Sequence, residues 1–508
     1  MQQNHYYNLI TLKWFYNFKN SHFKVFLKQQ LFVSFLTIIF SLLFYFFKID
    51  TQFFGFIFLI IALVSCAFKP IKLKKDLVVT NRIKRLLIIN FLVCFIAQFL
   101  ILFFAVKNNI LFCCLVFVLN MMLGGLTILS NIICYPIEAI IKKHYIIKAK
   151  KKLKSFKNLT IIAVTGSYGK TSTKNYLCEM LKTKYEVLCS PNSYNTPMGV
   201  TKTILEYLKP YHQILILEMG ADHNNDIYKL CKIASPNISI ITAVGAQHLK
   251  TFKTIDNIIN TKFQLVLGTQ ANGFFVTNTS NKICKLYFEN SPILSYDVNF
   301  ENNNDKKQPY AKISNVTTNE NGMTFNLKID DKVINFQTKL LGEFNAINIS
   351  LACVVAKKLG VKVEEIKNVV KNLKPTLHRL SLSTLKNGAV IIDDSFNSNP
   401  EGAKFACNVL KSFNKKHKVV ITCGMVELGE KQAAENYEFG KLLAEFDEVL
   451  IVNKLNYKAI NSGILFMGGK SAKCYKNFVE AYSYLTKKLN KNFVVLIEND
   501  LTDSYIIE

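Results

Sequence analysis

The segment from Ala163 to Leu177, AVTGSYGKTSTKNYL, contains residues that could bind phosphate. It follows a β-branched apolar run and precedes a pattern typical of a helix, so backbone N–H groups and a helix N-terminus would converge on an anion. Glycine allows close backbone approach, Lys170 can reach the outer phosphates, and the Thr171 hydroxyl can bind Mg²⁺. The glycine usually found five residues before the second glycine is replaced by Val164. The candidate nucleotide site, with ATP and Mg²⁺ as expected cofactors, comprises Gly166, Ser167, Tyr168, Gly169, Lys170, Thr171 and Ser172.

A carboxylate suited to the same chemistry ends the apolar run QILILEMG at Glu218. Open α/β sheets bind ligands at the carboxyl ends of their strands. Mg²⁺ prefers oxygen ligands, so a glutamate at such an edge could hold the metal beside phosphate. Taken alone, a glutamate at a strand end is more often simply solvated. The phosphate loop upstream favours the metal-binding interpretation.

Arginine is used sparingly, and one arginine stands out. Of the 63 lysine and arginine residues only three are arginines, and Arg379 is the only one after Arg85. Where lysine serves nearly everywhere else, a retained guanidinium indicates bidentate recognition of phosphate or carboxylate. Retention by chance is the alternative.

The elements that must position these residues fall into more than one domain. The chain has 508 residues, half of them apolar, which predicts two or three separately packed units. Four charge-free stretches precede residue 135: Leu31–Phe47, Phe53–Phe68, Leu86–Val106 and Ile110–Cys134. Their lengths predict about four transmembrane helices in a region spanning residues 31–150, after a cytoplasmic segment of residues 1–30. Buried helices of a soluble domain are the alternative interpretation.

Basic residues predict the orientation of these expected spans. Four lysines precede the first span, the loop from Lys69 to Arg85 has seven basic residues, and Lys142 to Lys157 has eight. By the positive-inside rule both termini and the middle loop are cytoplasmic. We therefore expect a multi-pass membrane protein whose catalytic domains lie in the cytoplasm.

The net charge of +28 does not indicate nucleic-acid binding. Much of it flanks the expected spans, where anionic membrane lipid is the simpler partner. The sequence has no zinc finger, aromatic RNA-binding motif or arginine-rich tract. Thirteen cysteines without a C-x-x-C pair favour reduced thiols that bind no metal.

From Leu159 onward, short β-branched runs alternate with helical periodicity, which is typical of a parallel sheet flanked by helices. We expect an α/β P-loop central domain over residues 151–375 and a Rossmann-like C-terminal α/β domain over residues 376–508. The expected strands are Thr160–Thr165, His212–Glu218, Ile238–Val244, Ala389–Asp393, Lys418–Cys423, Glu448–Val452 and Phe493–Ile497. The expected helices are Lys170–Thr183 and Asn345–Leu359, with hairpin patterning over Ala311–Leu341.

Eight motifs in one order resemble the Mur ligase family, most closely its branch that adds D-alanyl-D-alanine to the UDP-N-acetylmuramoyl tripeptide of peptidoglycan. They are TGSYGKTSTK, SPNSYNTPMGVTKTIL, LEMGADH, AVGAQHL, LLGEFNAINISLA, LHRL, IIDDSFNSNPEG and GMVELGEK, over roughly residues 158 to 430. Any one of them would be weak, but their number and order are specific. The resemblance implies an ATP-dependent ligase that forms an amide bond through an acyl phosphate. It also implies a bacterial protein, which would place the expected spans in the inner (cytoplasmic) membrane.

The resemblance implies catalytic and metal-binding roles at matching positions. Lys170 and Thr171 would hold ATP phosphate and Mg²⁺, and Glu218 and His248 would bind the metal. Lys262 matches a lysine that many members carbamylate to make an extra metal ligand. On spacing alone, neither His248 nor Lys262 would be singled out.

The resemblance also implies nucleotide and substrate contacts. The positions that match nucleotide contacts are Asn345, Asn348, Arg379 and Asp394. The position that matches an acyl-substrate contact is Asn195, and those in a loop associated with the incoming amine are Asn397 and Asn399. The implied substrates are the peptidoglycan precursor and D-alanyl-D-alanine, and the enzyme that transfers the precursor to lipid is a further expected contact.

Three departures limit what the resemblance implies. Phe344 stands where the family usually has a histidine, and LIENDLTDSY replaces a basic motif near the C-terminus. The domain that grips the uridine diphosphate sugar is not found, since the membrane-like region takes its place. A Mur-like amide ligase acting on a lipid-linked or other acyl substrate is therefore an alternative function. A membrane P-loop ATPase and a non-catalytic scaffold are further alternatives.

Overall fold

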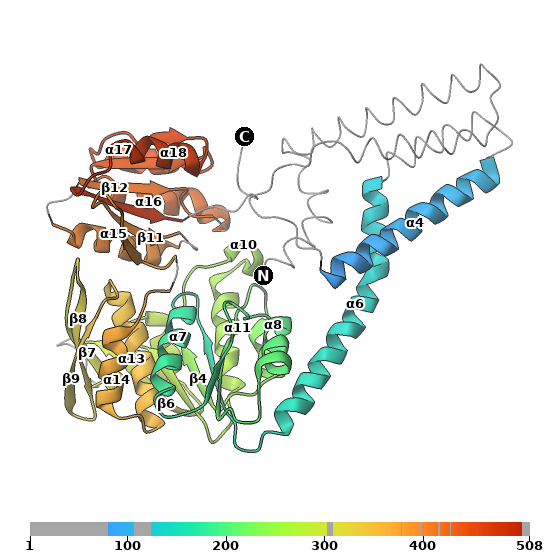
Figure 1. Ribbon diagram of the computed structural model, residues 1–508, viewed down its shortest axis with the longest axis horizontal. Coiled ribbons are helices and arrows are strands. Elements are labelled where there is room, and N and C mark those ends of the chain that lie inside the picture. The colour runs from blue at the N-terminus through green and yellow to red at the C-terminus, as the bar shows by residue number, and fades with distance from the viewer. Residues whose placement is uncertain are drawn as a thin grey trace. The chain divides into compact units, whose positions relative to one another are not determined.

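The computed structural model describes residues 80–105, 123–301, 308–376, 378–395, 399–414, 417–426 and 428–499 (Figure 1). The chain divides into two compact units, with the boundary between His144 and Tyr145. The first unit contains α4 (Asn81–Ala105) and the beginning of α6 (Leu123–Lys154), whereas the second contains the end of α6 and both sheets.

Polar contacts join the two described helices of the first unit. Arg85 Nη2 lies 2.7 Å from Glu138 Oε1, and the Ser130 hydroxyl donates a hydrogen bond to Asn90 Oδ1 at 3.0 Å. The helices do not coincide with the charge-free windows of the sequence. α4 begins before its window and includes Arg82 and Arg85, whereas α6 runs on through Glu138 into a lysine-rich end.

The predicted transmembrane bundle is wrong for the part of the chain that the structure describes. No helix there is long and apolar enough to span a membrane. The predicted multi-pass placement in the bacterial inner membrane depended on this bundle, so it is wrong for the same described residues. The expected spans Leu31–Phe47 and Phe53–Phe68 lie outside the described residues, as do residues 110–122 of the fourth expected span.

The second unit begins with a nine-stranded sheet in the order β2-β3-β1-β4-β5-β6-β7-β8-β9. Its strands are β1 (Thr160–Thr165), β2 (Val187–Cys189), β3 (Ile214–Glu218), β4 (Ile238–Ile241), β5 (Phe274–Asn278), β6 (Leu294–Phe300), β7 (Ala311–Asn319), β8 (Gly322–Ile329) and β9 (Lys332–Thr338). The strands from β2 to β7 pair in parallel, and β7, β8 and β9 are antiparallel.

Both faces of this sheet are covered by helices (Figure 1). α7 (Lys170–Leu181), α13 (Glu343–Lys358) and α14 (Val363–Asn372) contribute to the core on one face. The core on the other face receives residues from the end of α6 and from α8 (Pro197–Lys202), α9 (Asp226–Cys231), α11 (Ile255–Leu267) and α12 (Lys282–Glu289). Strand β1 is buried on both faces, because Ile162 and Val164 enter the first core and Ile161 and Ala163 the second.

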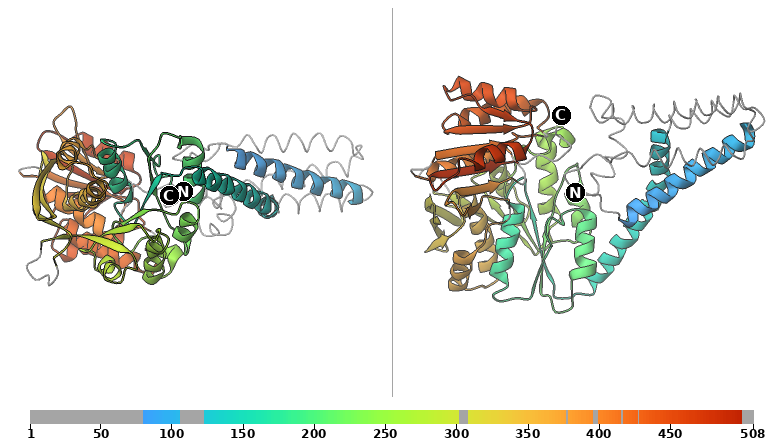
Figure 2. Two further views of the ribbon diagram at one scale, coloured as in Figure 1. Left: turned by 90° about the horizontal axis from the view of Figure 1, so that it is seen from below. Right: turned by 45° about the horizontal axis from the view of Figure 1, so that its top comes forward.

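A second sheet of six strands follows, in the order β10-β11-β15-β12-β13-β14. Its strands are β10 (Ser381–Thr384), β11 (Val390–Asp394), β12 (His417–Thr422), β13 (Glu448–Val452), β14 (Lys473–Tyr475) and β15 (Phe493–Glu498). Only the β10–β11 pair is antiparallel among these described strands. One core includes α15 (Pro400–Ser412), α16 (Gln432–Leu443) and α17 (Tyr457–Phe466), and the other includes α18 (Phe478–Thr486). Figure 2 shows this part of the chain, coloured orange to red, in two further views.

The two predicted α/β folds are therefore confirmed. The predicted strand bounds agree with the structure at β1 and β13, and within two residues at β3, β11, β12 and β15. The expected hairpin region forms β7, β8 and β9. The helix expected over Asn345–Leu359 begins two residues earlier, at Glu343, directly after its N-cap Gly342, which has a positive φ of 84°.

Candidate functional site

The phosphate-binding candidate is a tight loop between β1 and α7. Gly166 has φ 145° and Gly169 has φ 75°, conformations that favour glycine. A Cβ atom at Gly166 would collide with the Thr242 side chain, and one at Gly169 would collide with that of Asn348. Both glycines of the loop are thus required by backbone conformation and by space.

Residues after β4 hold this loop in place. The Ser167 N–H donates to Ala243 O at 2.7 Å, and the Ser167 hydroxyl donates to Gly245 O at 3.0 Å. The Thr242 hydroxyl donates to Tyr168 O. Because β1 and β4 are parallel neighbours that end at the same edge, the segment after β4 braces the loop from one side.

The Lys170 side chain folds back over the loop. Its Nζ donates to Gly166 O at 2.7 Å and to Ser167 O at 3.1 Å. Burial lowers the pKa of Lys170 to about 8, although the negative charge of Glu218 opposes the shift. The ammonium therefore lies at the mouth of the glycine loop, where an anionic phosphate would meet it.

Glu218, at the end of β3, is the centre of a buried hydrogen-bond cluster. The Thr171 hydroxyl donates to its Oε2 at 2.9 Å, and Asn195 Nδ2 donates to its Oε1 at 3.0 Å. Lys174 Nζ lies 3.7 Å from Oε2. The backbone N–H of Glu218 donates to the Ser190 hydroxyl at 3.1 Å. Three predicted site residues, Thr171, Asn195 and Glu218, are thus in direct contact.

The donor set of this cluster fits a hard divalent cation. It contains a carboxylate, a hydroxyl and an amide oxygen, which are the ligand types that Mg²⁺ prefers. The Asn195 Oδ1 atom is buried and has no hydrogen-bond partner among the described residues. Such an orphaned acceptor is costly unless a ligand satisfies it.

His248 and Lys262 lie in the same domain as Glu218, and both are near Asp222, whose negative charge, like that of Glu218, acts on Lys262. His248 Nε2 lies 3.6 Å from Asp222 Oδ1. Lys262 is 2% exposed, and burial lowers its pKa to about 7, with the charge of Lys170 adding to the shift. No group of three His, Cys, Asp or Glu side chains that could hold a metal is found among the described residues.

Two of the asparagines that match nucleotide contacts, Asn345 and Asn348, lie on α13 and face α7. Asn345 accepts a hydrogen bond from the Tyr176 hydroxyl at 2.8 Å, and Asn348 Oδ1 accepts one from the Thr173 hydroxyl at 3.1 Å. Asn348 Nδ2 is buried without a partner among the described residues. Their amides therefore brace the helix that begins at Lys170.

Two predicted site residues lie at or just after the carboxyl end of β11: Asp394 ends the strand, and Asn399 precedes α15. Asp394 Oδ1 accepts a hydrogen bond from the Leu380 N–H at 3.2 Å. Burial raises the pKa of Asp394 to about 6, and the positive charge of Arg379 opposes the shift. Asn399 is the N-cap of α15, where its Oδ1 accepts from the Gly402 N–H at 2.8 Å. Asn397 lies outside the described residues.

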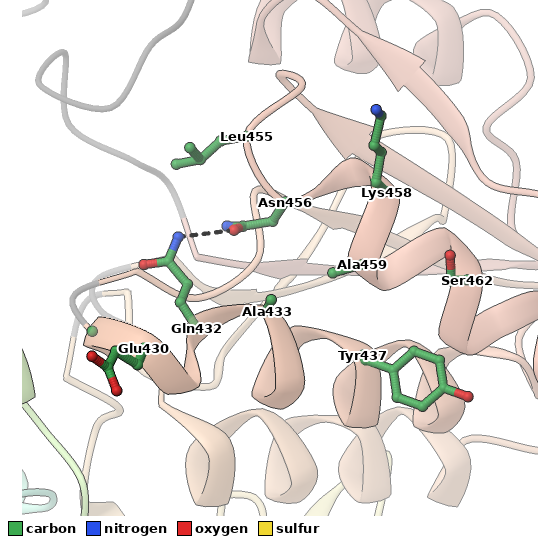
Figure 3. A pocket seen from close by; sticks show the side chains of 10 residues that line it. Glu430, Gln432, Ala433, Tyr437, Leu455, Asn456, Lys458, Ala459 and Ser462 are labelled. Atoms are coloured by element: carbon green, nitrogen blue, oxygen red, sulfur yellow. Dashed lines mark hydrogen bonds between the residues drawn. The ribbon is translucent and has the colours of Figure 1, made fainter.

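A shallow hollow of about 750 Å³ lies elsewhere on the C-terminal domain, between α16 and α17 (Figure 3). Its lining includes Glu430, Tyr437 and Lys458. Gln432 Nε2 donates to Asn456 Oδ1 at 3.1 Å across one end of it. None of the predicted site residues lines this hollow.

Two family models match the chain and together cover more than half of it. The Mur ligase middle domain matches residues 164–356, and the glutamate ligase domain of Mur ligases matches residues 378–498. The chain belongs to the Mur ligase family.

Relatives of this Mur ligase share one name. A UDP-N-acetylmuramoyl-tripeptide–D-alanyl-D-alanine ligase from Buchnera aphidicola subsp. Baizongia pistaciae is 27% identical over 386 residues, which cover 74% of this chain and 81% of the relative. One from Bacillus subtilis is 26% identical over 300 residues, covering 58% of this chain and 63% of the relative. The match thus spans less than two thirds of the Bacillus relative.

Solved structures of the family have the same fold. MurF from Thermotoga maritima, in complex with ADP, has a TM-score of 0.63 and 25% identity, covering 71% of this chain and 80% of that one. MurF from Acinetobacter baumannii has a TM-score of 0.62 and 23% identity, covering 70% and 77%.

One residue of the cluster, Lys174, is not among the residues predicted from the sequence. The sequence signal at Lys174 is its position one helical turn after Lys170. Among so many lysines, this spacing alone does not distinguish it. Residue-by-residue roles at this Mur ligase site are predictions. Two physical features of the site, the glycine loop and the lowered pKa of Lys262, can be tested directly.

We predict that Gly169→Ala weakens ADP binding by about tenfold or more, since its Cβ would press on Asn348 and distort the loop. Gly468→Ala is the matched control, because Gly468 has the same φ of 75° and a Cβ atom there would meet nothing within 4 Å. Isothermal titration calorimetry with ADP measures the effect. Equal affinities for the two variants would contradict the assigned geometry.

We also predict that wild-type stability, relative to Lys262→Met, rises as pH increases from about 7 to about 10. Lys262 has a depressed pKa in the fold, so in this window the unfolded chain binds more protons than the folded one, and stability increases with pH. Urea unfolding at several pH values, in buffer free of carbon dioxide so that the Lys262 amine is unmodified, measures the trend. The exposed Lys282→Met should show no such trend, and a flat difference for Lys262→Met would contradict the prediction.

Proposed function

We propose that this chain is an ATP-dependent ligase that adds D-alanyl-D-alanine to the UDP-N-acetylmuramoyl tripeptide in peptidoglycan precursor synthesis. The observation that carries the proposal is the contact of Glu218 with Thr171 from the phosphate loop and with Asn195 from the substrate motif. One buried cluster thus links the expected nucleotide and acyl sites. The shared name of the Buchnera and Bacillus relatives supports the same activity.

The proposed reaction begins with activation of a carboxylate, which is a poor electrophile. A carboxylate oxygen of the precursor attacks the γ-phosphorus of ATP, the bond to the β-phosphate oxygen breaks, and ADP leaves. Lys170 and the loop N–H groups orient the transferred phosphoryl group and stabilise its charge. The ADP bound to the Thermotoga relative supports the proposal that this chain binds an adenine nucleotide.

In the second step the amine of D-alanyl-D-alanine attacks the acyl carbon, phosphate leaves, and the nitrogen loses a proton to give the amide. Asn195 would orient the acyl group from the Glu218 cluster. Asn397 and Asn399 are the proposed amine-side residues. Asn345, Asn348, Arg379 and Asp394 are the proposed contacts of the nucleotide.

Mg²⁺ fits the donor set described above, and its chemistry would be to neutralise phosphate oxygens during transfer. The residues proposed to hold it are Thr171, Glu218, His248 and carbamylated Lys262. The hydroxyl of Thr171 and the carboxylate of Glu218 already lie within hydrogen-bond distance of each other. Both side chains are held in place by the cluster, so neither needs to move far to bind a cation.

Carbamylation of Lys262 is supported by its buried amine. Only a neutral amine adds to carbon dioxide, and a pKa of about 7 makes much of Lys262 neutral at physiological pH. The resulting carbamate would be negative, and the nearby positive charge of Lys170 would stabilise it.

We predict a carbamate carbon signal in the NMR spectrum of the protein equilibrated with carbon-labelled bicarbonate. The signal should be absent from Lys262→Met and present in Lys282→Met. A spectrum that is the same for wild type and Lys262→Met would contradict the modification.

A Mur-like ligase acting on a lipid-linked or other acyl substrate is the second candidate. The observation that favours it is that the motifs shared with the family begin only near residue 158, so no residues are assigned to the uridine diphosphate sugar. The expected contacts with membrane lipid and with the precursor-to-lipid transferase stay predictions. The membrane ATPase alternative rested on the predicted spans and is withdrawn with them.

We predict that Lys170→Ala lowers amide formation by about a thousandfold or more, because the transferred phosphoryl group loses its main protein charge. The assay combines phosphate release with mass spectrometry of the product from ATP, tripeptide precursor and D-alanyl-D-alanine. Lys182→Ala, which changes an exposed lysine close to the end of the same helix, should retain activity.

An active Lys170→Ala enzyme would contradict the role of the loop. No turnover by wild type, under conditions in which a known family member is active, would contradict the substrate. Turnover only with a lipid-linked acceptor would favour the second candidate.

A further inference from the structure

Lys174 is buried to a degree that lysine rarely reaches. It lies one turn after Lys170 on α7, is 1% exposed, and is among the largest fully buried side chains of the described residues. Fully buried lysines are almost always paired, because an ammonium in a dry interior is costly. The partners of Lys174 therefore indicate why the charge is there.

Three groups from two other segments surround the ammonium. Lys174 Nζ donates to Ser190 O at 2.8 Å and to Asn192 O at 2.7 Å. It also lies 3.7 Å from Glu218 Oε2. Ser190 and Asn192 belong to the segment between β2 and α8, and Glu218 ends β3. One side chain thus links α7, which begins in the phosphate loop, both to the segment of residues 190–195 and to the carboxylate of Glu218.

We infer that Lys174 is a positioning residue for the proposed reaction: it holds residues 190–195 and Glu218 in fixed relation to the phosphate loop. Asn195 and Glu218 can then present their oxygens to the acyl group and cation together. This inference rests on the proposed function. Lys174 is not itself expected to touch phosphate, because its three neighbours lie on the side of α7 that faces β2 and β3.

The segment from Ser190 to Asn195 needs such a tether. Its ends are anchored to the sheet, since the Ser190 N–H donates to Ile216 O at 2.8 Å and the Gly220 N–H donates to Asn195 O at 2.8 Å. Between them Asn192 has φ 44°, in the left-handed region, which few residues other than glycine adopt and which asparagine adopts more readily than most. Backbone hydrogen bonds inside the segment are local, from Tyr194 to Pro191 and from Asn195 to Ser193. Lys174 supplies direct hydrogen bonds from α7 to this segment, in addition to the indirect route from Asn195 through Glu218 to Thr171.

The contacts of Lys174 also fix the position of Asn195 Oδ1, the buried acceptor that has no partner among the described residues. Asn195 Nδ2 is engaged by Glu218, which leaves its buried Oδ1 for a ligand. The backbone of Gly220 closes the other side, because a Cβ atom there would lie 2.8 Å from Asn195 Cγ. A shift of the Asn192 backbone would therefore displace an oxygen that has little room to adjust.

A purely structural buried ion pair is the competing interpretation, and it makes different predictions. Loss of such a pair would lower global stability, but it would not weaken binding of the acyl substrate and Mg²⁺ more than binding of ADP. Three variants separate the two: Lys174→Met removes all polar contacts, Lys174→Gln keeps one donor group without charge, and Lys182→Met changes an exposed lysine close to the end of the same helix.

The first measurement is amide hydrogen exchange of residues 190–195 in the ligand-free protein. Loss of two charge-assisted hydrogen bonds should speed exchange of this segment by about tenfold or more in Lys174→Met. Lys174→Gln should be intermediate and Lys182→Met unchanged. Exchange at the wild-type rate in Lys174→Met would overturn the inference.

The second measurement separates the substrates. In Lys174→Met we expect the KM for the acyl substrate and the Mg²⁺ concentration for half activity to rise by about tenfold. ADP affinity without Mg²⁺ should stay within about threefold, because the phosphate loop itself is untouched. An equal loss of affinity for the acyl substrate and for ADP, or a change confined to kcat, would overturn the inference.

These outcomes are distinguishable from failure of the proposed function. If wild type forms no amide, the proposed function fails, while hydrogen exchange and the ADP titration with and without Mg²⁺ still decide the role of Lys174. If Lys174→Met does not fold, the same measurements on Lys174→Gln decide it.

Discussion

The buried carboxylate of Glu218 is the interaction on which the rest of the site depends. Three side chains reach it from two separate segments: Thr171 and Lys174 come from α7, and Asn195 comes from the segment after β2. A carboxylate that is 1% exposed would be costly without such partners. Burial of Glu218 in the folded sheet is therefore coupled to formation of the cluster, which brings the expected nucleotide and acyl sites together.

The parallel sheet explains why this cluster lies where it does. β1, β3 and β4 are neighbours whose carboxyl ends meet at one edge, so the glycine loop, Glu218 and the segment after β4 converge there. Helix α13 adds a second constraint, because Asn345 and Asn348 hydrogen-bond to side chains of α7. The orphaned amide atoms of Asn195 and Asn348 are the groups left over for ligands. The family's ligase chemistry needs this kind of prearranged polar edge, since phosphoryl transfer depends on positioning and electrostatics.

Much of this site could be predicted from the sequence, but for different reasons at different residues. Lys170, Thr171 and Glu218 follow from the strand–glycine–helix pattern and from the strand-edge rule. Asn195 needed the family resemblance, because nothing in its spacing indicates a contact with Glu218. Lys174 could not be predicted, since burial of a lysine is a tertiary property. The helices of the first unit show the opposite error: charge-free windows suggested membrane spans, yet α4 and α6 extend beyond these windows and pair Arg85 with Glu138. Asn399, assigned by resemblance to the amine site, is also the N-cap of α15.

The most direct test of the account is the fate of the oxygen atoms of the acyl substrate. The precursor carboxylate would be labelled with heavy oxygen, converted with ATP and D-alanyl-D-alanine, and the released phosphate analysed by mass spectrometry. If the Glu218 cluster holds a carboxylate for attack on ATP, one labelled oxygen must leave with each phosphate. Phosphate that carries only unlabelled oxygen, alongside normal amide formation, would contradict the account.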